Sequence, residues 1–196
     1  MKALKRHEQR LLRTALAAVA ILCAVVVAGC GGSTTQPTPT PASACNIPTG
    51  HTGVELYLTS TATSVKVGQD FQVAVFLHGV PDPFGVAFEV MYPSSRVHIT
   101  GYSSCSESAF GKGGVIPLWQ DEPDSNRGSY AVTRERGSQP VSASDNVVCT
   151  FTCRATAAGA AVFSFDGMVE VRKSDGSLID QFASLRKTPV TVSITQ

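Results

Sequence analysis

The sequence predicts an all-β sandwich of about nine strands, preceded by a segment that does not belong to the fold. Apolar and polar residues alternate with a period of two in a series of short segments, as in strands that are buried on one face. No segment after the first thirty residues sustains the 3.6-residue period of an amphipathic helix. Of 196 residues, 43% are hydrophobic and 16% are charged, which is typical of a globular domain.

Alternation is clearest in two neighbouring segments, Phe71 to Leu77 and Phe84 to Tyr92. Counted from the first phenylalanine of each segment, every second residue is Phe, Val, Leu or Tyr. We therefore expect these residues, Phe84 included, to face the core. The connection from Gly79 to Pro83 contains two prolines, which fix φ and remove backbone donors, so the chain leaves the sheet there.

Further segments with the length and composition of strands follow at short, regular spacing: Val54 to Thr59, Val97 to Tyr102, Val115 to Gln120, Ser129 to Arg134, Val147 to Ala155, Ala160 to Phe165 and Thr188 to Ile194. A small hairpin is predicted from Met168 to Arg172 and Leu178 to Ile179, around the turn dipeptide Asp175-Gly176. Because Pro117 cannot donate a ladder hydrogen bond, its strand is expected at the edge of a sheet.

The first 29 residues have the organisation of an export signal. A basic start is followed by 14 apolar residues, Ala15 to Ala28, fewer than the roughly 20 that a transmembrane helix needs. We therefore expect a signal helix over residues 1–29. Residues 30–44 consist mainly of Gly, Ser, Thr and Pro without any charge, which predicts a disordered, semi-extended linker. The folded domain is expected over residues 45–196.

The signal ends in Val27-Ala28-Gly29-Cys30, which resembles a bacterial lipobox, where the cysteine is lipidated and becomes the mature N-terminus. The alternative is an ordinary cleavage site that meets a cysteine by chance. We predict lipidation of Cys30, with the lipid bilayer as a partner and the bacterial cell envelope as the location. Gly31 rather than Asp after the cysteine favours the outer membrane, in an organism that has two membranes.

Charge excludes one class of partner. Removal of residues 1–29 takes away five of the 16 basic residues and one of the 15 acidic residues, which leaves a mature net charge near −3. No cluster of Lys and Arg remains, and phosphate binding needs a basic surface. We therefore expect no nucleic-acid partner.

Four cysteines fall in the predicted domain, and an exported chain reaches a compartment where disulfides persist: Cys45, Cys105, Cys149 and Cys153. Cys149 and Cys153 share one face of a predicted strand at about 13 Å, whereas a disulfide needs Cα atoms closer than about 7 Å. Each is therefore expected to pair with Cys45 or Cys105. The alternative is a redox or metal site, but three residues separate the two sulfurs and the histidines are scattered. We expect no metal and no cofactor.

Several motifs, in their order and spacing, resemble those of cohesin domains. Val65-Lys-Val-Gly-Gln-Asp-Phe-Gln-Val73 precedes a Gly/Pro loop and an alternating strand that ends in Tyr92-Pro-Ser-Ser95. The likeness continues at Tyr130-Ala-Val-Thr-Arg134, at residues 147–155 and at residues 159–165, so it covers most of residues 54–196. The acidic residue that usually follows the tyrosine in the family is missing, because Pro93 stands there.

The cohesin resemblance implies a jelly-roll sandwich and a non-catalytic protein-binding role. In the family's strand order, the segment that holds Cys105 runs antiparallel beside the segment that holds Cys149. The resemblance therefore implies disulfides from Cys105 to Cys149 and from Cys45 to Cys153. A non-reducing mass map with Cys45 bonded to Cys149 would contradict this pairing.

Catalytic and calcium-binding signals are weak. The sequence contains no Gly-x-Ser-x-Gly elbow, His-Glu-x-x-His motif, Walker loop or Gly-x-Gly-x-x-Gly motif, so we do not expect an enzyme. A hydrolase would have to use carboxylates that converge in space, with these candidates: Glu89, Asp121, Glu122 and Asp166. Asp124, Asn126 and Gly128 faintly resemble a calcium loop, but the closing Glu is absent and Arg127 opposes a cation. A polar hairpin connection is the favoured interpretation of this loop.

Three classes of function remain open. The favoured one is a membrane-anchored, extracytoplasmic binding or scaffolding lipoprotein with an unknown envelope or extracellular protein as partner. The second is a carbohydrate-binding module for a surface polysaccharide, which would need several coplanar aromatics, and Trp119 is the only tryptophan. The third is a hydrolase, which no motif supports.

The resemblance also suggests where a partner docks. In cohesins, the dockerin partner docks on the sheet face that includes the strand corresponding to Phe84 to Tyr92. Of the outward positions of this strand, Gly85, Ala87, Glu89 and Met91, only Glu89 can form the hydrogen bonds made by polar side chains in dockerin-binding members. The sequence therefore favours a different protein partner, with these residues as binding candidates: Glu89, Met91, Trp119, Tyr130 and Arg134. The alternative is that Trp119 and Tyr130 close the core.

Overall fold

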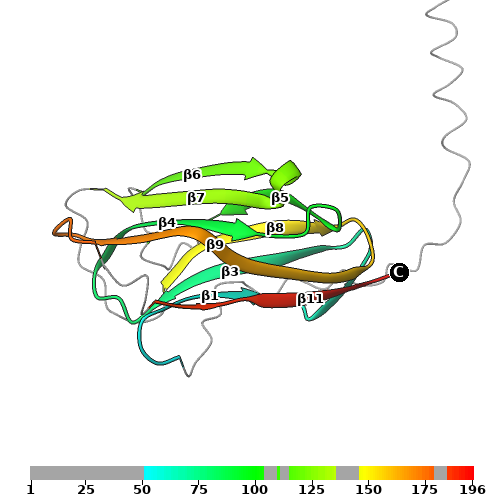
Figure 1. The fold of residues 1–196 in the computed structure, drawn as a ribbon, viewed down its shortest axis with the longest axis horizontal. Helices are drawn as coiled ribbons and strands as arrows, with labels where there is room; N and C mark the ends of the chain where they lie inside the picture. Colours follow the sequence, from blue (N-terminus) through cyan, green and yellow to red (C-terminus); the bar gives the residue numbers. More distant parts are fainter. Residues whose placement is uncertain (1–50, 104–109, 111–114, 136–145, 179–184) are drawn as a thin grey trace, which may run out of the picture. The chain divides into compact units, whose positions relative to one another are not determined.

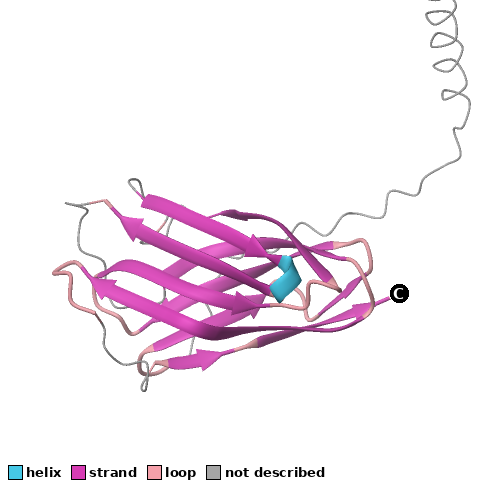
Figure 2. Ribbon diagram, turned by 45° about the horizontal axis from the view of Figure 1, so that its top comes forward, coloured by secondary structure: helices cyan, strands magenta, loops and turns pink. Residues whose placement is uncertain are grey.

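The computed structural model of the chain describes residues 51–103, 110, 115–135, 146–178 and 185–196. Within these ranges the chain forms eleven β-strands and a short 3-10 turn, η1 (Pro123–Ser125). Figures 1 and 2 show the strands in two sheets that lie face to face. The prediction of an all-β sandwich is therefore confirmed. The predicted signal helix, the linker and Cys30 lie outside the described residues.

One sheet has five strands, in the order β10-β1-β3-β8-β5. Its strands pair antiparallel, except that β1 and β10 are parallel. The strand bounds are β10 (Arg186–Thr188), β1 (Glu55–Ser60), β3 (Asp70–His78), β8 (Asn146–Ala155) and β5 (Val97–Ser103).

The other sheet has six strands, in the order β2-β11-β9-β4-β7-β6. Here β2 and β11 are parallel and the remaining neighbours are antiparallel. The strand bounds are β2 (Ser64–Lys66), β11 (Val190–Thr195), β9 (Gly159–Lys173), β4 (Pro83–Met91), β7 (Arg127–Arg134) and β6 (Val115–Glu122).

The core lies between the two sheets and is built from the alternating residues. Val73 and Val75 of β3 and Val86, Phe88 and Val90 of β4 are at most 2% exposed. Full burial of one such side chain contributes about 1.5–3 kcal/mol to folding. The period-two pattern therefore identified most of the inward positions of these strands correctly.

Phe84 is an exception, because the predicted alternation fails at the start of β4. The pairing register between β4 and β9 shifts between Pro83 and Gly85, which marks a β-bulge or irregularity. As a result Pro83 is buried, whereas Phe84 is half-buried and lies outside the core cluster. The expectation that Phe84 faces the core was wrong.

Each predicted strand segment coincides with a strand to within a few residues at its ends, but the division into strands differs in places. The segment from Thr188 to Ile194 is split at Pro189, so that β10 and β11 belong to different sheets. Residues 160–165 and 168–172 form one long strand, β9, whose register with β4 shifts between Phe88 and Val90. Two strands of three residues each, β2 and β10, were not expected as separate strands.

Two predictions about local structure are confirmed. β6, which contains Pro117, is an edge strand, since among the described strands it pairs with β7 alone. The hairpin turns at Asp175-Gly176, where Arg172 bridges Leu178, while Ile179 lies outside the described residues. Within the described ranges, no helix is long and apolar enough to cross a membrane.

Candidate functional site

The outer face of the six-stranded sheet carries the most exposed large aliphatic side chains in the described part of the chain. Ile116 and Leu118 of β6 are 65% and 67% exposed. Their strand pairs with β7, β7 pairs with β4, and β4 pairs with β9, so outward residues line up in rows across four strands. The registers give the first two rows as Ile116–Thr133–Gly85–Arg172 and Leu118–Ala131–Ala87–Glu170.

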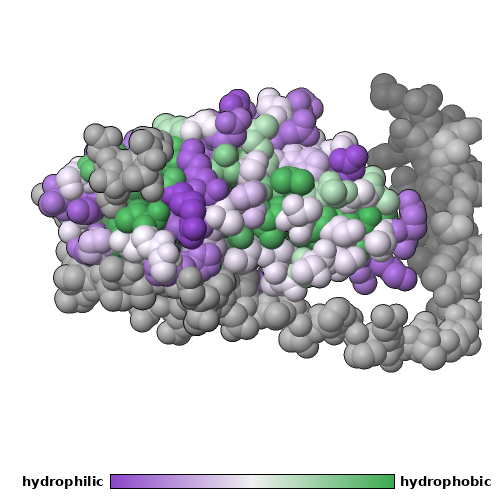
Figure 3. Space-filling model, turned by 60° about the horizontal axis from the view of Figure 1, so that its bottom comes forward, coloured by the Kyte–Doolittle hydropathy of each residue, from purple (hydrophilic) through white to green (hydrophobic). Residues whose placement is uncertain are grey.

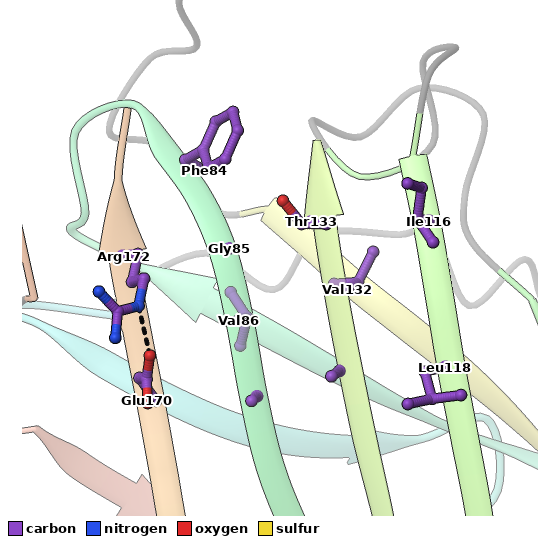
Figure 4. Close-up of a pocket in the computed structure, with 11 residues that line it drawn as sticks. Phe84, Gly85, Val86, Ile116, Leu118, Val132, Thr133, Glu170 and Arg172 are labelled. Carbon is purple, nitrogen blue, oxygen red and sulfur yellow. Dashed lines mark hydrogen bonds and ion pairs between the residues drawn. The ribbon is translucent and has the colours of Figure 1, made fainter. Parts of the chain in front are cut away.

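These two rows form a shallow depression of about 360 Å³, here called the trough. Its floor has little side-chain bulk, because the outward residues of the two middle strands are Gly85, Ala87, Ala131 and Thr133. Ile116 and Leu118 form the wall on β6, as Figure 4 shows. The opposite wall on β9 is an ion pair between Glu170 and Arg172, and Phe84 lies at one end. The trough therefore has an open, mostly apolar floor, with Thr133 as its polar residue, between the larger side chains of β6 and β9.

The outer face continues beyond the trough into a charged region, here called the acidic end. Glu89 of β4 and Glu122 of β6 both pair with Arg127 of β7. The distances are 3.5 Å from Arg127 Nη1 to Glu89 Oε2 and 3.2 Å from Arg127 Nη2 to Glu122 Oε2. The Gln120 amide donates to Glu122 over 2.9 Å. One guanidinium thus forms ion pairs with two carboxylates.

An aromatic cluster beneath the face holds these strands in place. The Trp119 ring packs 4.8 Å from the ring of Phe151 in the opposite sheet, and the Phe88 and Tyr130 rings lie 5.4 Å apart. Gly128 makes room for the indole, since a Cβ built there would lie 2.0 Å from Trp119 Cη2. The face therefore rests on a tightly packed interior.

The hypothesis that Trp119, Tyr130 and Arg134 are surface anchors does not agree with these positions. Trp119 packs against the core, and Tyr130 is 1% exposed. Arg134 is buried, and its Nη1 donates to the Asp82 carboxylate at 2.9 Å and to the Pro83 carbonyl at 3.1 Å. The inward positions of β7 carry Tyr130 and Arg134, so the alternative that the aromatics close the core is correct. Trp119 itself is half-buried, with its ring packed against that of Phe151.

Glu89 and Met91 lie on the outer face as predicted, and both are half-buried. Their role in binding stays a prediction. Ile116 and Leu118 were missed as site residues. The sequence contained a signal for them. The predicted strand from Val115 to Gln120 has apolar residues on both of its faces, although only one face of such a strand is buried in the sandwich.

The loop that resembled a calcium site is held by its own hydrogen bonds. Asn126 adopts a left-handed conformation after η1, with φ 54°. Its side-chain oxygen accepts from the Ser94 backbone N–H at 3.0 Å and from the Ser94 hydroxyl at 2.9 Å. Nearby, the Tyr92 hydroxyl donates to Asp121. Burial raises the pKa of Tyr92 above its usual range, and this hydrogen bond raises it further. In the described part of the chain, no group of three His, Cys, Asp or Glu side chains is placed to hold a metal ion.

Both described cysteines of β8 face the core. Cys149 and Cys153 are 0% exposed and are not bonded to each other. Burial raises the pKa of both thiols. Their predicted partners, Cys45 and Cys105, lie outside the described residues, so the disulfide pairing stays a prediction.

A buried carboxylate on the five-stranded sheet was not anticipated from the sequence. Glu55 of β1 is 1% exposed and accepts hydrogen bonds from Arg186 at 2.5 Å, from Thr188 and from His51 at 2.9 Å. Burial alone raises its pKa, but the hydrogen bonds outweigh this effect, and the Arg186 charge assists them, so the pKa of Glu55 falls to about 2. Glu55 thus ties the three-residue strand β10 to β1.

Comparison with known proteins supports the fold assignment. The sequence matches no protein-family model and no curated protein sequence. Among solved structures, a type II cohesin from an Acetivibrio cellulolyticus cohesin–X-dockerin complex has a TM-score of 0.61 at 10% identity, over 73% of this chain and 100% of that one.

Two further solved structures are similar. A cohesin from a type I cohesin–dockerin complex of Clostridium thermocellum has a TM-score of 0.59 at 14% identity, over 74% of this chain and 100% of that one. A non-cellulosomal cohesin from the archaeon Archaeoglobus fulgidus has a TM-score of 0.56 at 13% identity, over 74% of this chain and 93% of that one. The chain therefore has a cohesin-like fold.

Proposed function

We propose that this chain is a non-catalytic binding module that holds a protein partner on the outer face of its six-stranded sheet. The observation that carries this proposal is the exposure of Ile116 and Leu118, at 65% and 67%, beside the trough. Covering apolar surface contributes about 25 cal/mol per Å², so aliphatic side chains beside a hollow favour a complementary surface. On the side that Figure 3 shows, hydrophobic residues form separate patches divided by hydrophilic ones.

The partner contacts the face of the sheet rather than its edge. β6 is the edge strand next to the trough, and Pro117 lies in its middle. Proline has no backbone N–H, so a strand added along this edge would lack a hydrogen bond at its centre. Side chains of the outer face therefore carry the interaction.

The width of the trough suits a helix. The walls stand on β9 and β6, which are separated by three strand spacings, about 14 Å at about 4.8 Å per spacing. An α-helix with its side chains is about 10–12 Å across. The cohesins solved in complex with dockerins support a protein as partner. Here Gly85 and Ala87 offer no side-chain hydrogen bonds, so we expect apolar contacts to dominate.

Site-specific cross-linking tests this function in cells. A photo-reactive amino acid at position 118 of the full-length chain should cross-link a protein partner. The matched control places the same amino acid at Val67, which is 39% exposed in the turn between β2 and β3, away from the trough. Ile116→Ser should weaken the cross-link from position 118. Equal products from positions 118 and 67, or none from 118, would contradict the proposed docking face.

The module is tethered to the cell envelope through lipidated Cys30, in our proposal. The lipobox-like sequence that ends in Cys30 supports it, together with the uncharged linker that follows. Cys30→Ser should abolish incorporation of a labelled fatty acid and move the protein out of the membrane fraction. Unchanged labelling of the variant would refute the anchor without affecting the docking face.

A further inference from the structure

The outer face changes character along its strands. At one end the trough is apolar, with the Glu170–Arg172 pair as its charged wall. The acidic end begins two residues beyond Ala87 on β4, at Glu89, and four residues beyond Leu118 on β6, at Glu122. In the part of this face formed by β9, β4, β7 and β6, the outward carboxylates Glu89, Glu122 and Glu170 outnumber the cations Arg127 and Arg172.

The shared cation leaves the acidic end with negative charge. Arg127 lies between Glu89 and Glu122, whose side chains remain 23% and 32% exposed. One positive charge cannot neutralise two carboxylates, so water solvates the remainder. A partner that covers this end removes that water, which is unfavourable unless the partner supplies positive charge. An acidic partner would add repulsion to the loss of solvation.

We propose that the partner's contact element is aliphatic where it covers the trough and carries Lys or Arg where it covers Glu89 and Glu122. This inference rests on the proposed function, because it names the partner chemistry of the same face. Aliphatic side chains fit the floor, since Gly85, Ala87 and Ala131 carry no polar side chain and the Thr133 hydroxyl donates to the Arg134 carbonyl. Charge complementarity then fixes the direction in which the element lies.

The spacing of the two features sets the design of a probe. Leu118 and Glu122 are four residues apart on β6, about 13 Å at about 3.3 Å per residue. A helix covers that length in about nine residues at 1.5 Å each. The probe is therefore a helical peptide with a leucine ridge and two lysines about nine residues from its centre. The matched control has the same ridge with two glutamates in place of the lysines.

Binding of both peptides to the full-length chain in detergent is measured by fluorescence anisotropy. The lysine peptide should bind about tenfold more tightly than the glutamate peptide, and added salt should reduce the difference. Glu89→Lys combined with Glu122→Lys should reverse the preference. Should that charge reversal impair folding, Glu89→Gln with Glu122→Gln is expected to remove the preference without reversing it. Circular dichroism confirms that each variant is folded.

The outcomes separate this inference from the proposed function. If both peptides bind equally and Leu118→Ser weakens that binding, the inferred Lys or Arg of the partner is overturned and the docking face is kept. Binding that Leu118→Ser does not change would contradict the docking face itself. Failure of both peptides to bind at 1 mM would overturn the inference, while the cross-link at position 118 decides the proposed function separately.

Discussion

The buried carboxylate of Glu55 allows a quantitative prediction for the substitution Glu55→Gln. Glutamine has nearly the same shape as glutamate but lacks the negative charge. In the native state that charge accepts hydrogen bonds from Arg186, Thr188 and His51. The folded-state pKa of about 2, against an ordinary value of 4.5, means that folding favours the ionised form. This contribution is fully present above about pH 4.5 and is lost as the pH falls toward 2.

The magnitude follows from the shift. A difference of about 2.5 pKa units corresponds to about 3.4 kcal/mol at 1.36 kcal/mol per unit. The Arg186 side chain is 59% exposed, so solvent screens part of its interaction with Glu55. We therefore expect Glu55→Gln to lower the free energy of unfolding at pH 7 by about 2 kcal/mol, a fall in Tm of about 4–8 °C.

Urea unfolding at several pH values checks both the size and the pH dependence. The gap between wild type and Glu55→Gln should be full at pH 7 and should narrow between pH 4.5 and 2.5. Glu170→Gln is the matched control, since Glu170 pairs with Arg172 at the surface and should cost less than about 1 kcal/mol. A Glu55→Gln variant as stable as wild type at pH 7, or a gap that does not change with pH, would refute the reasoning.

Two further substitutions test the packing behind the docking face. Gly128→Ala should lower the free energy of unfolding by about 1–3 kcal/mol, because the added methyl group crowds Trp119. Gly101→Ala is the control: no atom lies within 4 Å of its added Cβ, so it should lower the free energy of unfolding by less than about 0.5 kcal/mol. Equal thermal stabilities of the two variants would contradict this expectation. Arg134→Met should cost about 2–4 kcal/mol in urea unfolding, because Asp82 loses its buried ion-pair partner, and a neutral result would show that Arg134 is dispensable for folding.

The fold could be predicted because alternation reports burial directly. In β4 and β7 buried positions alternate with more exposed ones, and the inward positions Val73, Val75, Phe88 and Val90 could be assigned to the core without knowledge of their neighbours. Pro117 likewise identified an edge strand through the donor that it lacks. Both inferences use properties of a single strand.

The site could be predicted only in part, because it depends on which strands are neighbours. Trp119 looked like a surface anchor by residue type, but its indole fills the space that Gly128 leaves on the adjacent strand. Ile116 and Leu118 became recognisable once the register set them beside Ala131 of β7. Glu55 was overlooked for the same reason, since Arg186 approaches it from a strand 131 residues away.

Register shifts lie at both ends of the trough and explain why alternation alone could not outline it. The register between β4 and β9 shifts once between Pro83 and Gly85 and again between Phe88 and Val90. The first shift leaves Phe84 out of the core, at the end of the trough. The second places Gly167, with φ +67°, against the Glu89 carboxylate, next to the exposed Asp166. A bulge re-aims side chains without ending the sheet, so the trough ends at Phe84 on one side and gives way to Glu89 on the other.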